Sequence, residues 1–284
     1  MNAALSMTAS DWLKGTTNQL SDAGIESARL DAILLLCDEL GVDKTAILAY
    51  PERKLQRSEL QNLSTKVTQR TQHTPLAYLR GQVEFYGREF SVSHHVLVPR
   101  PESEAIIELC RQTAVHTSSA TIIDIGTGSG CLAITAKLEL PDTTVYATDI
   151  NKDCLSVART NAEALHATIN LLTGNLLEPL RDSGYDAQGS IILANLPYVP
   201  LDYPINAAAK HEPRLALFSG RDGLDHYRTL FSQIHDFAIY PSFVIAEALE
   251  SQHDTLADIA QEAGYALQET AGLAQLFSYT AVTA

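Results

Sequence analysis

The sequence has few cysteines and no close pair of them. Its four cysteines lie far apart, and none has the C-x-x-C spacing of a zinc site or a redox motif. Each stands in an apolar or helical context, which is typical of a buried free thiol. We therefore expect neither a metal site nor a disulfide framework from these residues, which are Cys37, Cys110, Cys131 and Cys154.

Long apolar runs are also missing. No segment approaches the roughly 20 consecutive apolar residues that cross a bilayer. The first residues, MNAALSMTASDWLKG, have no basic start and no long apolar core, so they do not resemble a signal peptide. We expect a cytoplasmic protein that does not use a membrane.

Basic charge is scarce as well. The 20 lysines and arginines are outnumbered by 34 acidic residues, which gives a formal net charge of −14. Proteins that bind duplex DNA usually carry a basic face, because neutralising phosphates provides most of the affinity. We expect a monomer without a direct nucleic-acid substrate, and the acidity suits a basic protein partner. A local basic patch stays open, to which Arg80, Arg88, Arg100 and Arg214 would contribute.

The order of the expected elements divides the 284 residues into three parts. Residues 1–75 predict a helical bundle, which we interpret as a substrate-docking domain. Residues 76–99 alternate and are rich in aromatic and β-branched side chains around Gly87, which predicts a β-hairpin linker. Residues 100–284 alternate strands with helices, which predicts an α/β domain with a doubly wound, mainly parallel sheet and an antiparallel edge.

Two local signals set expected boundaries. Ser10 and Asp11 are good capping residues, so we expect them to begin the first helix. The alternating pattern of the hairpin continues to Val98. This places His94 and His95 in its second half, where we interpret them as turn or surface histidines.

A glycine-rich segment, DIGTGSG, lies where a predicted strand meets a predicted helix. Glycine allows a ligand to approach the backbone closely, and the helix start supplies free N–H donors. The spacing is G-x-G-x-G, not the G-x-G-x-x-G of dinucleotide sites. This tighter turn suits the amino-acid part of S-adenosylmethionine, which has no pyrophosphate. Asp149 ends the next strand, where a carboxylate accepts both hydrogens of a ribose diol. A nicotinamide cofactor shares both features and stays open here.

The NLPY tetrad, Asn195 to Tyr198, directly follows another apolar strand. Ligands of open sheets bind beyond the carboxyl ends of strands near the topological switch, so the tetrad should face the same crevice. One group that such a tetrad could bind is a substrate amide whose nitrogen is to be methylated. An amide nitrogen is a poor nucleophile because its lone pair is delocalised. The Asn195 side-chain oxygen and the Leu196 carbonyl would hold its two hydrogens, Pro197 would stiffen the turn, and the Tyr198 ring would face the substrate. Such catalysis is alignment and electrostatics, without a metal. A simple turn is the alternative interpretation.

Together these segments resemble the release-factor glutamine methyltransferases (the HemK/PrmC family) over nearly the whole chain. The interdomain hairpin of that family is similar to TPLAYLRGQVEFYGREF, and its cofactor loop to DIGTGSGCLAI. Its PRPETE segment resembles VLVPRPESE, with Ser103 in place of Thr. Its NPPY motif resembles NLPY, and the following segment resembles HEPRLALFSGRDGLDHYR.

The resemblance implies a Rossmann-like class I methyltransferase domain that uses S-adenosylmethionine. It implies N5-methylation of the glutamine in the Gly-Gly-Gln motif of peptide chain release factors, which the helical domain helps to dock. The implied cofactor residues are Gly126, Thr127, Gly128, Ser129 and Gly130 for the methionine part, Asp149 for the ribose, Asn175 and Leu176 for the adenine, and Asn195. The implied catalytic residues, which hold the glutamine, are Asn195, Leu196, Pro197 and Tyr198.

Three positions depart from the family pattern. Leu196 replaces the first proline of NPPY, so the turn loses one φ restraint while the accepting carbonyl remains. Asn175 stands where an acid is common, and it can still accept from the adenine amino group. The strand segment IAEALESQ lacks the glycine that usually follows its glutamate, which we interpret as local packing.

Further charged residues have two interpretations each. Glu102 and Glu104 would line the cofactor entrance or serve as ordinary acids at a helix start. Arg100 would orient the tetrad or the cofactor, or form a structural ion pair. Long loops in compact domains are often functional, so we expect substrate-facing roles for three residues of the predicted loop 199–222: His211, Glu212 and Arg214.

Four other functions compete with this interpretation. A nucleic-acid adenine-N6 methyltransferase would use Tyr198 to stack a flipped base. Another protein glutamine, such as one on a ribosomal protein, would need the same chemistry. A non-catalytic module of the translation apparatus is favoured only by Leu196. A nicotinamide dehydrogenase lacks a catalytic acid or base placed for hydride transfer.

Overall fold

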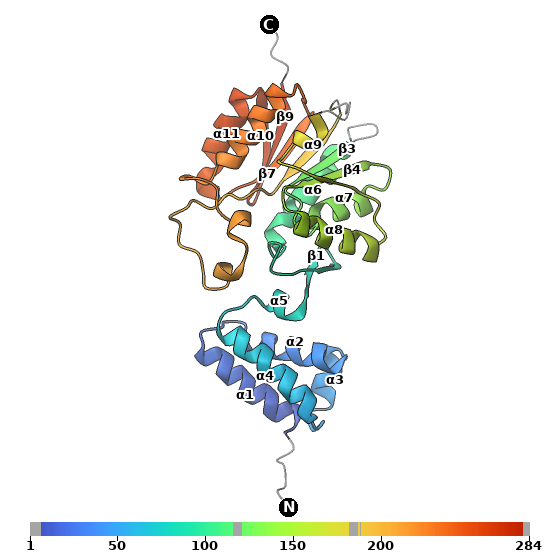
Figure 1. Cartoon of the computed structure of the whole chain (residues 1–284), viewed down its shortest axis with the longest axis vertical. Helices are drawn as coiled ribbons and strands as arrows, with labels where there is room; N and C mark the ends of the chain where they lie inside the picture. The colour runs from blue at the N-terminus through green and yellow to red at the C-terminus, as the bar shows by residue number, and fades with distance from the viewer. Residues whose placement is uncertain (1–6, 116–120, 182–186, 188, 281–284) are drawn as a thin grey trace, which may run out of the picture. The chain divides into compact units, whose positions relative to one another are not determined.

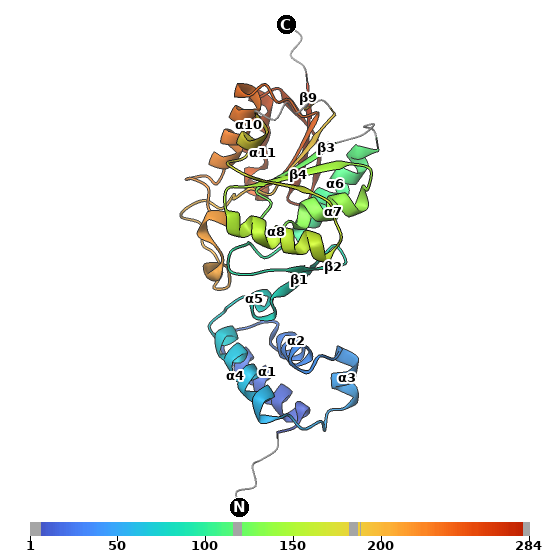
Figure 2. The same cartoon turned by 45° about the vertical axis from the view of Figure 1, so that its right-hand side comes forward.

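The chain forms two compact units in the computed structural model, which describes residues 7–115, 121–181, 187 and 189–280. One unit holds the residues up to Gly81 together with Asn206–His211. The other holds Gln82–Ile205 and the residues from Glu212 onward. Figures 1 and 2 show the elements of each unit from two directions. None of the helices within the described ranges is long and apolar enough to cross a membrane.

The first unit is the expected helical bundle. Its apolar residues recur at helical spacing, and they meet in a core that includes Leu20, Leu35, Leu36 and Leu63, each fully buried. Its helices are α1 (Ala9–Asp22), α2 (Ala28–Leu40), α3 (Lys44–Ala49), α4 (Arg57–Thr71) and α5 (Leu76–Arg80).

The start of α1 differs from the expectation. Thr8, not Ser10 or Asp11, is the N-cap residue: its hydroxyl accepts a hydrogen bond from the Asp11 backbone N–H at 3.1 Å. The Asp11 carboxylate accepts in return from the Thr8 hydroxyl at 2.7 Å. Asp11 is therefore the third helical residue of a capping box, and the expected cap was placed two residues too late.

The hairpin is shorter than expected. Strands β1 (Gln82–Phe85) and β2 (Arg88–Ser91) pair antiparallel around a turn in which Gly87 has φ +71°. The ladder ends at Ser91 because the Asn161 side chain takes both backbone groups of that residue, at 2.7 and 3.0 Å. The expectation that the hairpin continues to Val98 was therefore wrong. His94 and His95 lie beyond it, in a turn.

A mainly parallel sheet of seven strands builds the second unit, as expected. From one edge to the other the order is β5-β4-β3-β6-β7-β9-β8. The first five of these strands are parallel, and β9 runs antiparallel to both of its neighbours. The strands are β3 (Thr121–Ile125), β4 (Thr144–Asp149), β5 (Asn170–Thr173), β6 (Ile191–Ala194), β7 (Phe243–Glu247), β8 (Tyr265–Ala271) and β9 (Ala274–Tyr279).

Helices cover both faces of this sheet (Figure 1). The central strands are apolar on both sides, and β6 is buried at every position, which is typical of a sheet between two helical layers. One core joins the sheet to α6 (Glu104–Ala114), α7 (Cys131–Glu139) and α8 (Lys152–Ala164). The other joins it to α9 (Glu178–Arg181), α10 (Asp225–Asp236) and α11 (His253–Glu262).

The strand order places the topological switch between β3 and β6. The chain leaves β3 for β4 on one side and leaves β6 for β7 on the other. Ligands of open sheets bind beyond the carboxyl ends of the strands at such a point. The segments that follow these ends are the glycine-rich loop, the NLPY tetrad and the residues around Glu247.

Candidate active site

The glycine-rich loop connects β3 to α7 in a conformation that needs glycine. Gly126, Gly128 and Gly130 have φ values of +72°, +54° and +82°. A Cβ on Gly130 would lie 3.0 Å from the Cβ of Ala158 in α8, so glycine also allows close helix packing there. The Gly126 and Thr127 N–H groups each donate to the Thr148 carbonyl at 2.9 Å. The loop is thereby fixed against the end of β4.

Asp149 ends β4 and joins that strand to the loop. Its Oδ2 accepts from the Gly128 N–H at 3.0 Å, and its Oδ1 accepts from the Asn151 N–H at 2.8 Å. Burial raises the pKa of the carboxyl, while both hydrogen bonds lower it. Each carboxylate oxygen keeps a second lone pair, so Asp149 has capacity for a diol.

Asp124 is a buried acid that the sequence interpretation missed. It lies in β3 and accepts from the Thr127 hydroxyl at 2.6 Å and from the Ala133 N–H at 3.1 Å. Burial raises its pKa to about 7. Its two hydrogen bonds join the loop to the first turn of α7. Its position at the head of DIGTGSG is the signal that points to this role.

Asn161 was also missed. Its side-chain amide donates to the carbonyls of Ser129 and Ser91, at 2.8 and 3.0 Å. The Ser129 end of the loop is thereby tied to the hairpin through α8. A single polar residue within an amphipathic helix gave no signal of this.

Asn175 and Leu176 follow the carboxyl end of β5, on the side of Asp149. The Gly174 N–H donates to the Asp149 carbonyl at 3.1 Å, which holds this segment beside β4. Leu176 is buried and has φ +53°, an unusual value for a residue with a side chain. The structure therefore brings both residues to the same edge of the sheet as the glycine-rich loop.

The tetrad lies at the end of β6 with each side chain fixed differently. The Asn195 amide donates through Nδ2 to the Ser103 hydroxyl at 2.8 Å. The Leu196 side chain is 2% exposed, and a Cβ on Gly126 would lie 3.2 Å from its Cδ2. The tetrad therefore packs directly against the glycine-rich loop. The Tyr198 hydroxyl donates to Glu247 Oε1 at 3.0 Å, and burial raises the Tyr198 pKa.

Leu196 replaces proline without leaving its backbone N–H unpaired. That N–H donates to the Tyr227 hydroxyl at 3.4 Å, a long hydrogen bond. The Tyr227 oxygen also lies 2.9 Å from the Ala194 carbonyl and 2.5 Å from the Glu247 carbonyl. Tyr227 thus joins the ends of β6 and β7 behind the tetrad, and restrains the turn where the proline ring is missing.

Gln252 and Gly223 support the tetrad from its other end. The Gln252 side-chain amide donates to the carbonyls of Tyr198 and Asp222, at 2.8 and 2.6 Å. Gly223 has φ +86°, and a Cβ there would lie closer than 3.0 Å to the Tyr198 carbonyl oxygen and to Gln252 Nε2. Only glycine fits this close approach without moving the tetrad.

Replacing Gly223 with alanine is therefore expected to lower the free energy of unfolding by about 3 kcal/mol or more, from φ strain and the backbone clash together. Gly87→Ala is the matched control, since Gly87 has φ +71° and no atom within 4 Å of the added Cβ. It should lose only about 1 kcal/mol. Urea unfolding of both variants measures the difference. Equal losses would show that Gly223 does not contact the tetrad as described.

The remaining charged candidates mostly form structural contacts. Arg100 pairs with the buried Glu212 carboxylate, which also accepts from the Val98 N–H at 3.2 Å. The Glu104 carboxylate accepts from the Tyr86 N–H at 2.9 Å, which fixes the hairpin turn. Glu102 stays exposed at the helix start.

The loop and histidine candidates lie apart from the tetrad contacts. His211 belongs to the helical unit, where its Nε2 lies 2.8 Å from the Gln72 carbonyl. Arg214 stacks on Phe218, 4.6 Å from the ring centroid. His95 lies 3.6 Å from an Asp153 carboxylate oxygen. Among the described residues, no group of three or more His, Cys, Asp or Glu side chains is placed to hold a metal ion.

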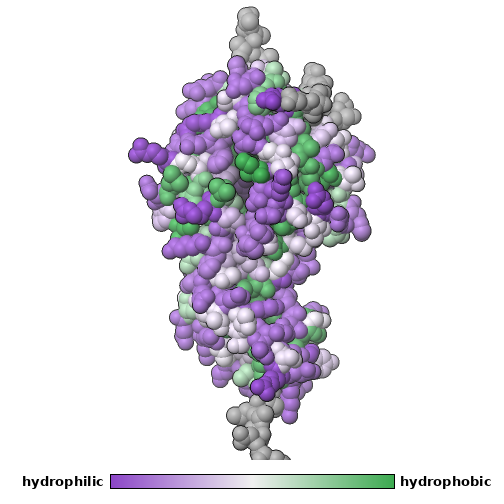
Figure 3. Space-filling view, viewed as in Figure 1, coloured by the Kyte–Doolittle hydropathy of each residue, from purple (hydrophilic) through white to green (hydrophobic). Residues whose placement is uncertain are grey.

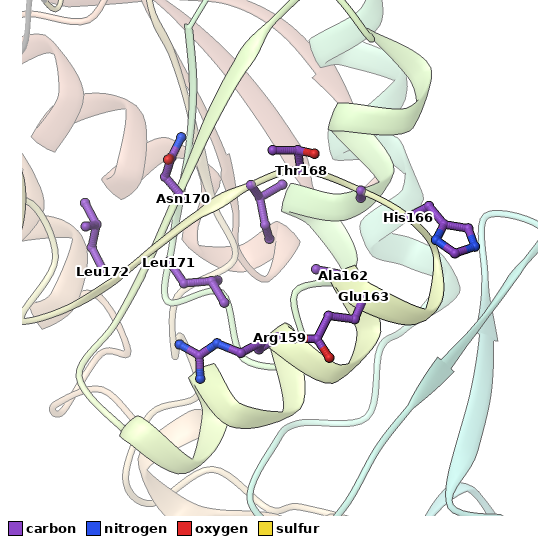
Figure 4. Close-up of a pocket in the computed structure, with 10 residues that line it drawn as sticks. Arg159, Ala162, Glu163, His166, Thr168, Asn170, Leu171 and Leu172 are labelled. Atoms are coloured by element: carbon purple, nitrogen blue, oxygen red, sulfur yellow. The ribbon is translucent and has the colours of Figure 1, made fainter.

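A surface cavity of about 760 Å³ lies between α8 and β5 (Figure 4). Arg159 and Glu163 line it from the helix and Leu171 from the strand. None of its lining residues belongs to the glycine-rich loop or the tetrad, and Asp149 is not among them. The cavity is therefore separate from the candidate active site, which is defined by the hydrogen bonds above.

Comparison with known proteins gives two family matches. Residues 11–81 match the PrmC N-terminal domain, and residues 103–201 match the methyltransferase small domain. Among solved structures, the hMettl16 catalytic domain in complex with MAT2A 3'UTR hairpin 1 has a TM-score of 0.53. That match covers 81% of this chain and 85% of the other, at 13% identity, and it supports the fold alone.

Curated relatives match most of the chain. A release factor glutamine methyltransferase of Geobacter sulfurreducens is 33% identical over 258 residues, which cover 90% of this chain and 88% of the relative. One of Bacillus subtilis is 34% identical and covers 78% of each chain. One of Moorella thermoacetica is 34% identical and covers 91% of each. At this identity and coverage, the chain belongs to the release factor glutamine methyltransferase family.

Proposed function

We propose that this protein transfers a methyl group from S-adenosylmethionine to N5 of the glutamine in the Gly-Gly-Gln motif of peptide chain release factors. The observation that carries the proposal is the fixed orientation of the Asn195 amide. Because its Nδ2 donates to Ser103, its Oδ1 is left as an acceptor at the end of β6. The relatives named release factor glutamine methyltransferases support the choice of substrate.

The residues beyond β3 and β4 fit the cofactor. The three loop glycines have positive φ values. Because they have no side chains, the backbone of the loop is open to an amino-acid moiety. Asp149 is already oriented by two N–H groups and keeps lone pairs for a ribose diol. We assign the methionine part to residues 126–130, the ribose to Asp149, and the adenine to Asn175 and Leu176. When bound, S-adenosylmethionine supplies an activated methyl group on its sulfonium.

The tetrad then supplies alignment. A glutamine amide has two N–H donors, and Asn195 Oδ1 and the Leu196 carbonyl are two acceptors on adjacent residues. Holding both hydrogens orients the nitrogen and increases its electron density. Pro197 restricts the turn, and Tyr198 presents its ring with the hydroxyl held by Glu247. The buried Leu196 side chain keeps this turn against the loop.

The arrangement of charge favours a protein substrate over a nucleic acid. The arginines that would have formed a basic patch have local partners. Arg80 pairs with Asp38 and Arg88 with Glu139, at 2.7 and 2.6 Å. Arg100 pairs with Glu212, and Arg214 stacks on Phe218. With a net charge of −14, little phosphate-binding capacity remains in this set.

Exposed apolar side chains in the loop that follows the tetrad suit a protein partner. The face shown in Figure 3 is mostly hydrophilic, with small separate hydrophobic groups. Within the predicted loop 199–222, Leu201, Tyr203 and Leu215 are 51%, 48% and 83% exposed. Of these, tyrosine is enriched where proteins bind proteins. We propose that the enzyme acts as a monomer in the cytoplasm, where release factors work.

A methylation assay tests the proposal. Purified protein, S-adenosylmethionine and a purified bacterial release factor are incubated, and the Gly-Gly-Gln peptide is read by mass spectrometry. We expect a gain of one methylene, about 14 Da, on the glutamine, which is the size of one methyl replacing hydrogen. A release factor with Gln→Ala in the motif is the control. Cofactor binding without methylation would favour another acceptor, with ribosomal protein and adenine-containing RNA as the next substrates, or a binding module.

A further inference from the structure

We propose that Ser103 and Glu247 are positioning residues that decide which end of the Asn195 side chain faces the substrate. The inference rests on the proposed function, since it concerns the same tetrad. An asparagine amide has a donor end and an acceptor end of almost identical shape. Only the acceptor end can hold a hydrogen of a substrate amide. The neighbours of Asn195 must therefore distinguish the two ends.

The side chains of Ser103 and Glu247 lie with that of Asn195 in a buried corner behind the tetrad. Ser103 ends the 3-10 helix Pro101–Ser103 and is 2% exposed, and its hydroxyl oxygen accepts from Asn195 Nδ2 at 2.8 Å. Glu247 ends β7 and is 1% exposed. Its Oε1 accepts from the Tyr198 hydroxyl at 3.0 Å. Its Oε2 has no hydrogen-bond partner among the described residues.

The direction of each hydrogen bond follows from the number of protons. A serine hydroxyl has one proton, and an ionised carboxylate has none to donate. Glu247 Oε2 is a buried acceptor without a partner among the described residues of this corner, and Ser103 and Asn195 lie near enough to lower the pKa of the carboxyl. The unpartnered Oε2 is therefore the acceptor available to the Ser103 proton, which leaves the Ser103 oxygen to accept from Asn195. Only the NH2 end of Asn195 satisfies that oxygen, so Oδ1 is directed away from the corner.

A donor in place of the carboxylate would reverse the direction of these hydrogen bonds. If residue 247 donated to Ser103, the serine proton would be free to donate to Asn195 Oδ1. The amide would then present its NH2 group to the substrate amide, which is itself a donor. Two donors facing each other lose the hydrogen bond and leave polar groups unpaired. The methyl acceptor would be oriented less well for transfer, although the cofactor residues would be unchanged.

The buried Glu247 carboxylate is not balanced by a cation in the described part of the chain. Burial raises the pKa of Glu247, as does the nearby Glu102 carboxylate, while Ser103, Tyr198 and Asn195 lower it. The Tyr227 hydroxyl and the Cys131 thiol also lie within its electrostatic influence. Within the described residues no lysine or arginine pairs with it. A buried acid without a cation reduces stability unless its hydrogen bonds compensate, and such groups cluster at functional sites.

The test compares Ser103→Ala with Ser103→Thr, which keeps the hydroxyl and matches the PRPETE segment of the family. With a Gly-Gly-Gln peptide as acceptor, Ser103→Ala is expected to lower kcat about tenfold, the size of one lost hydrogen bond. The peptide KM and the cofactor Kd should change less than twofold. Ser103→Thr should keep kcat within about twofold of the wild type. Glu247→Gln should lower kcat at least as much as Ser103→Ala, and the double variant should be no worse than Glu247→Gln alone.

A second measurement does not need turnover. The Asn195 side-chain NH2 protons, assigned by NMR through their loss in Asn195→Asp, should exchange slowly in the wild type and in Ser103→Thr. They should exchange faster in Ser103→Ala. If the wild type methylates nothing, the proposed function fails, and the exchange rates still decide the orientation of Asn195. Equal kcat for Ser103→Ala and the wild type, equal losses in Ser103→Ala and Ser103→Thr, or unchanged exchange would each overturn the inference.

Discussion

Replacing Asn195 with alanine is expected to lower kcat for release factor methylation by about 10²–10³-fold, the usual effect of removing one oriented hydrogen-bonding group from an active site. The variant loses the Oδ1 acceptor that would hold one hydrogen of the glutamine amide. The Leu196 carbonyl remains, so some alignment persists. Because alanine also leaves the Ser103 hydroxyl without its donor, a small loss of stability accompanies the loss of rate. Initial rates at saturating cofactor and peptide measure the effect.

The matched control for this prediction is Asn170→Ala. Asn170 is an exposed asparagine at the start of β5, in the same unit, with one hydrogen bond to the Val145 carbonyl. It should keep the wild-type rate. Cofactor affinity, measured by calorimetry, should differ less than about threefold between Asn195→Ala and the wild type. A rate for Asn195→Ala near that of the control would show that the tetrad does not hold the methyl acceptor.

The central sheet and the glycine-rich loop were predictable because their signals are local. Short apolar runs such as TIIDI and IILA, each followed by a turn segment, define strands that are buried on both faces. Gly126, Gly128 and Gly130 stand together in the chain, and all three have positive φ. Asp149 was predictable because it is the acid at the end of the next strand. Each of these features is visible in one short segment or in two consecutive strand ends, so sequence order alone was enough.

The supports of the tetrad were not predictable because they come from distant segments. Gly223 and Gln252 approach the Tyr198 carbonyl from segments that lie 25 and 54 positions away in the chain. Tyr227 and Glu247 look like ordinary residues of an amphipathic helix and a buried strand. Their hydroxyl and carboxyl groups reach the tetrad only because β6 and β7 are neighbours in the sheet.

The same reason explains the errors at element ends. The alternating pattern after Ser91 is real, but a side chain of α8 occupies the backbone groups that would have continued the ladder. A residue 70 positions away thus decides where the hairpin ends. In α1, Thr8 competes with Ser10 as the cap, and the reciprocal bond with Asp11 decides in favour of Thr8. Patterns therefore predicted which elements form more reliably than where they end.

Replacing Asp149 with alanine is expected to weaken cofactor binding by about 10²–10³-fold, because one or two charge-assisted hydrogen bonds are lost at about 1.5–3 kcal/mol each. The same change removes the acceptors of the Gly128 and Asn151 N–H groups, so the loop loses part of its order. Asp149→Asn, which keeps one acceptor oxygen, should fall between the two proteins. Calorimetry with S-adenosylhomocysteine measures all three. Asp142→Ala, which removes an exposed acid of the turn before β4, is the control and should bind as the wild type does.

The affinity for S-adenosylhomocysteine should depend on pH through the titration of Asp149. A diol is bound by the ionised carboxylate, so protonation weakens the complex by up to tenfold per pH unit below the pKa. Burial raises that pKa above the ordinary aspartate value, so affinity should begin to fall at a higher pH than an exposed aspartate would cause. Asp149→Asn cannot titrate there, and its affinity should be flatter across the same acidic range. A wild-type affinity that stays constant down to the ordinary pKa of aspartate, about 3.9, would contradict a carboxylate at the ribose position.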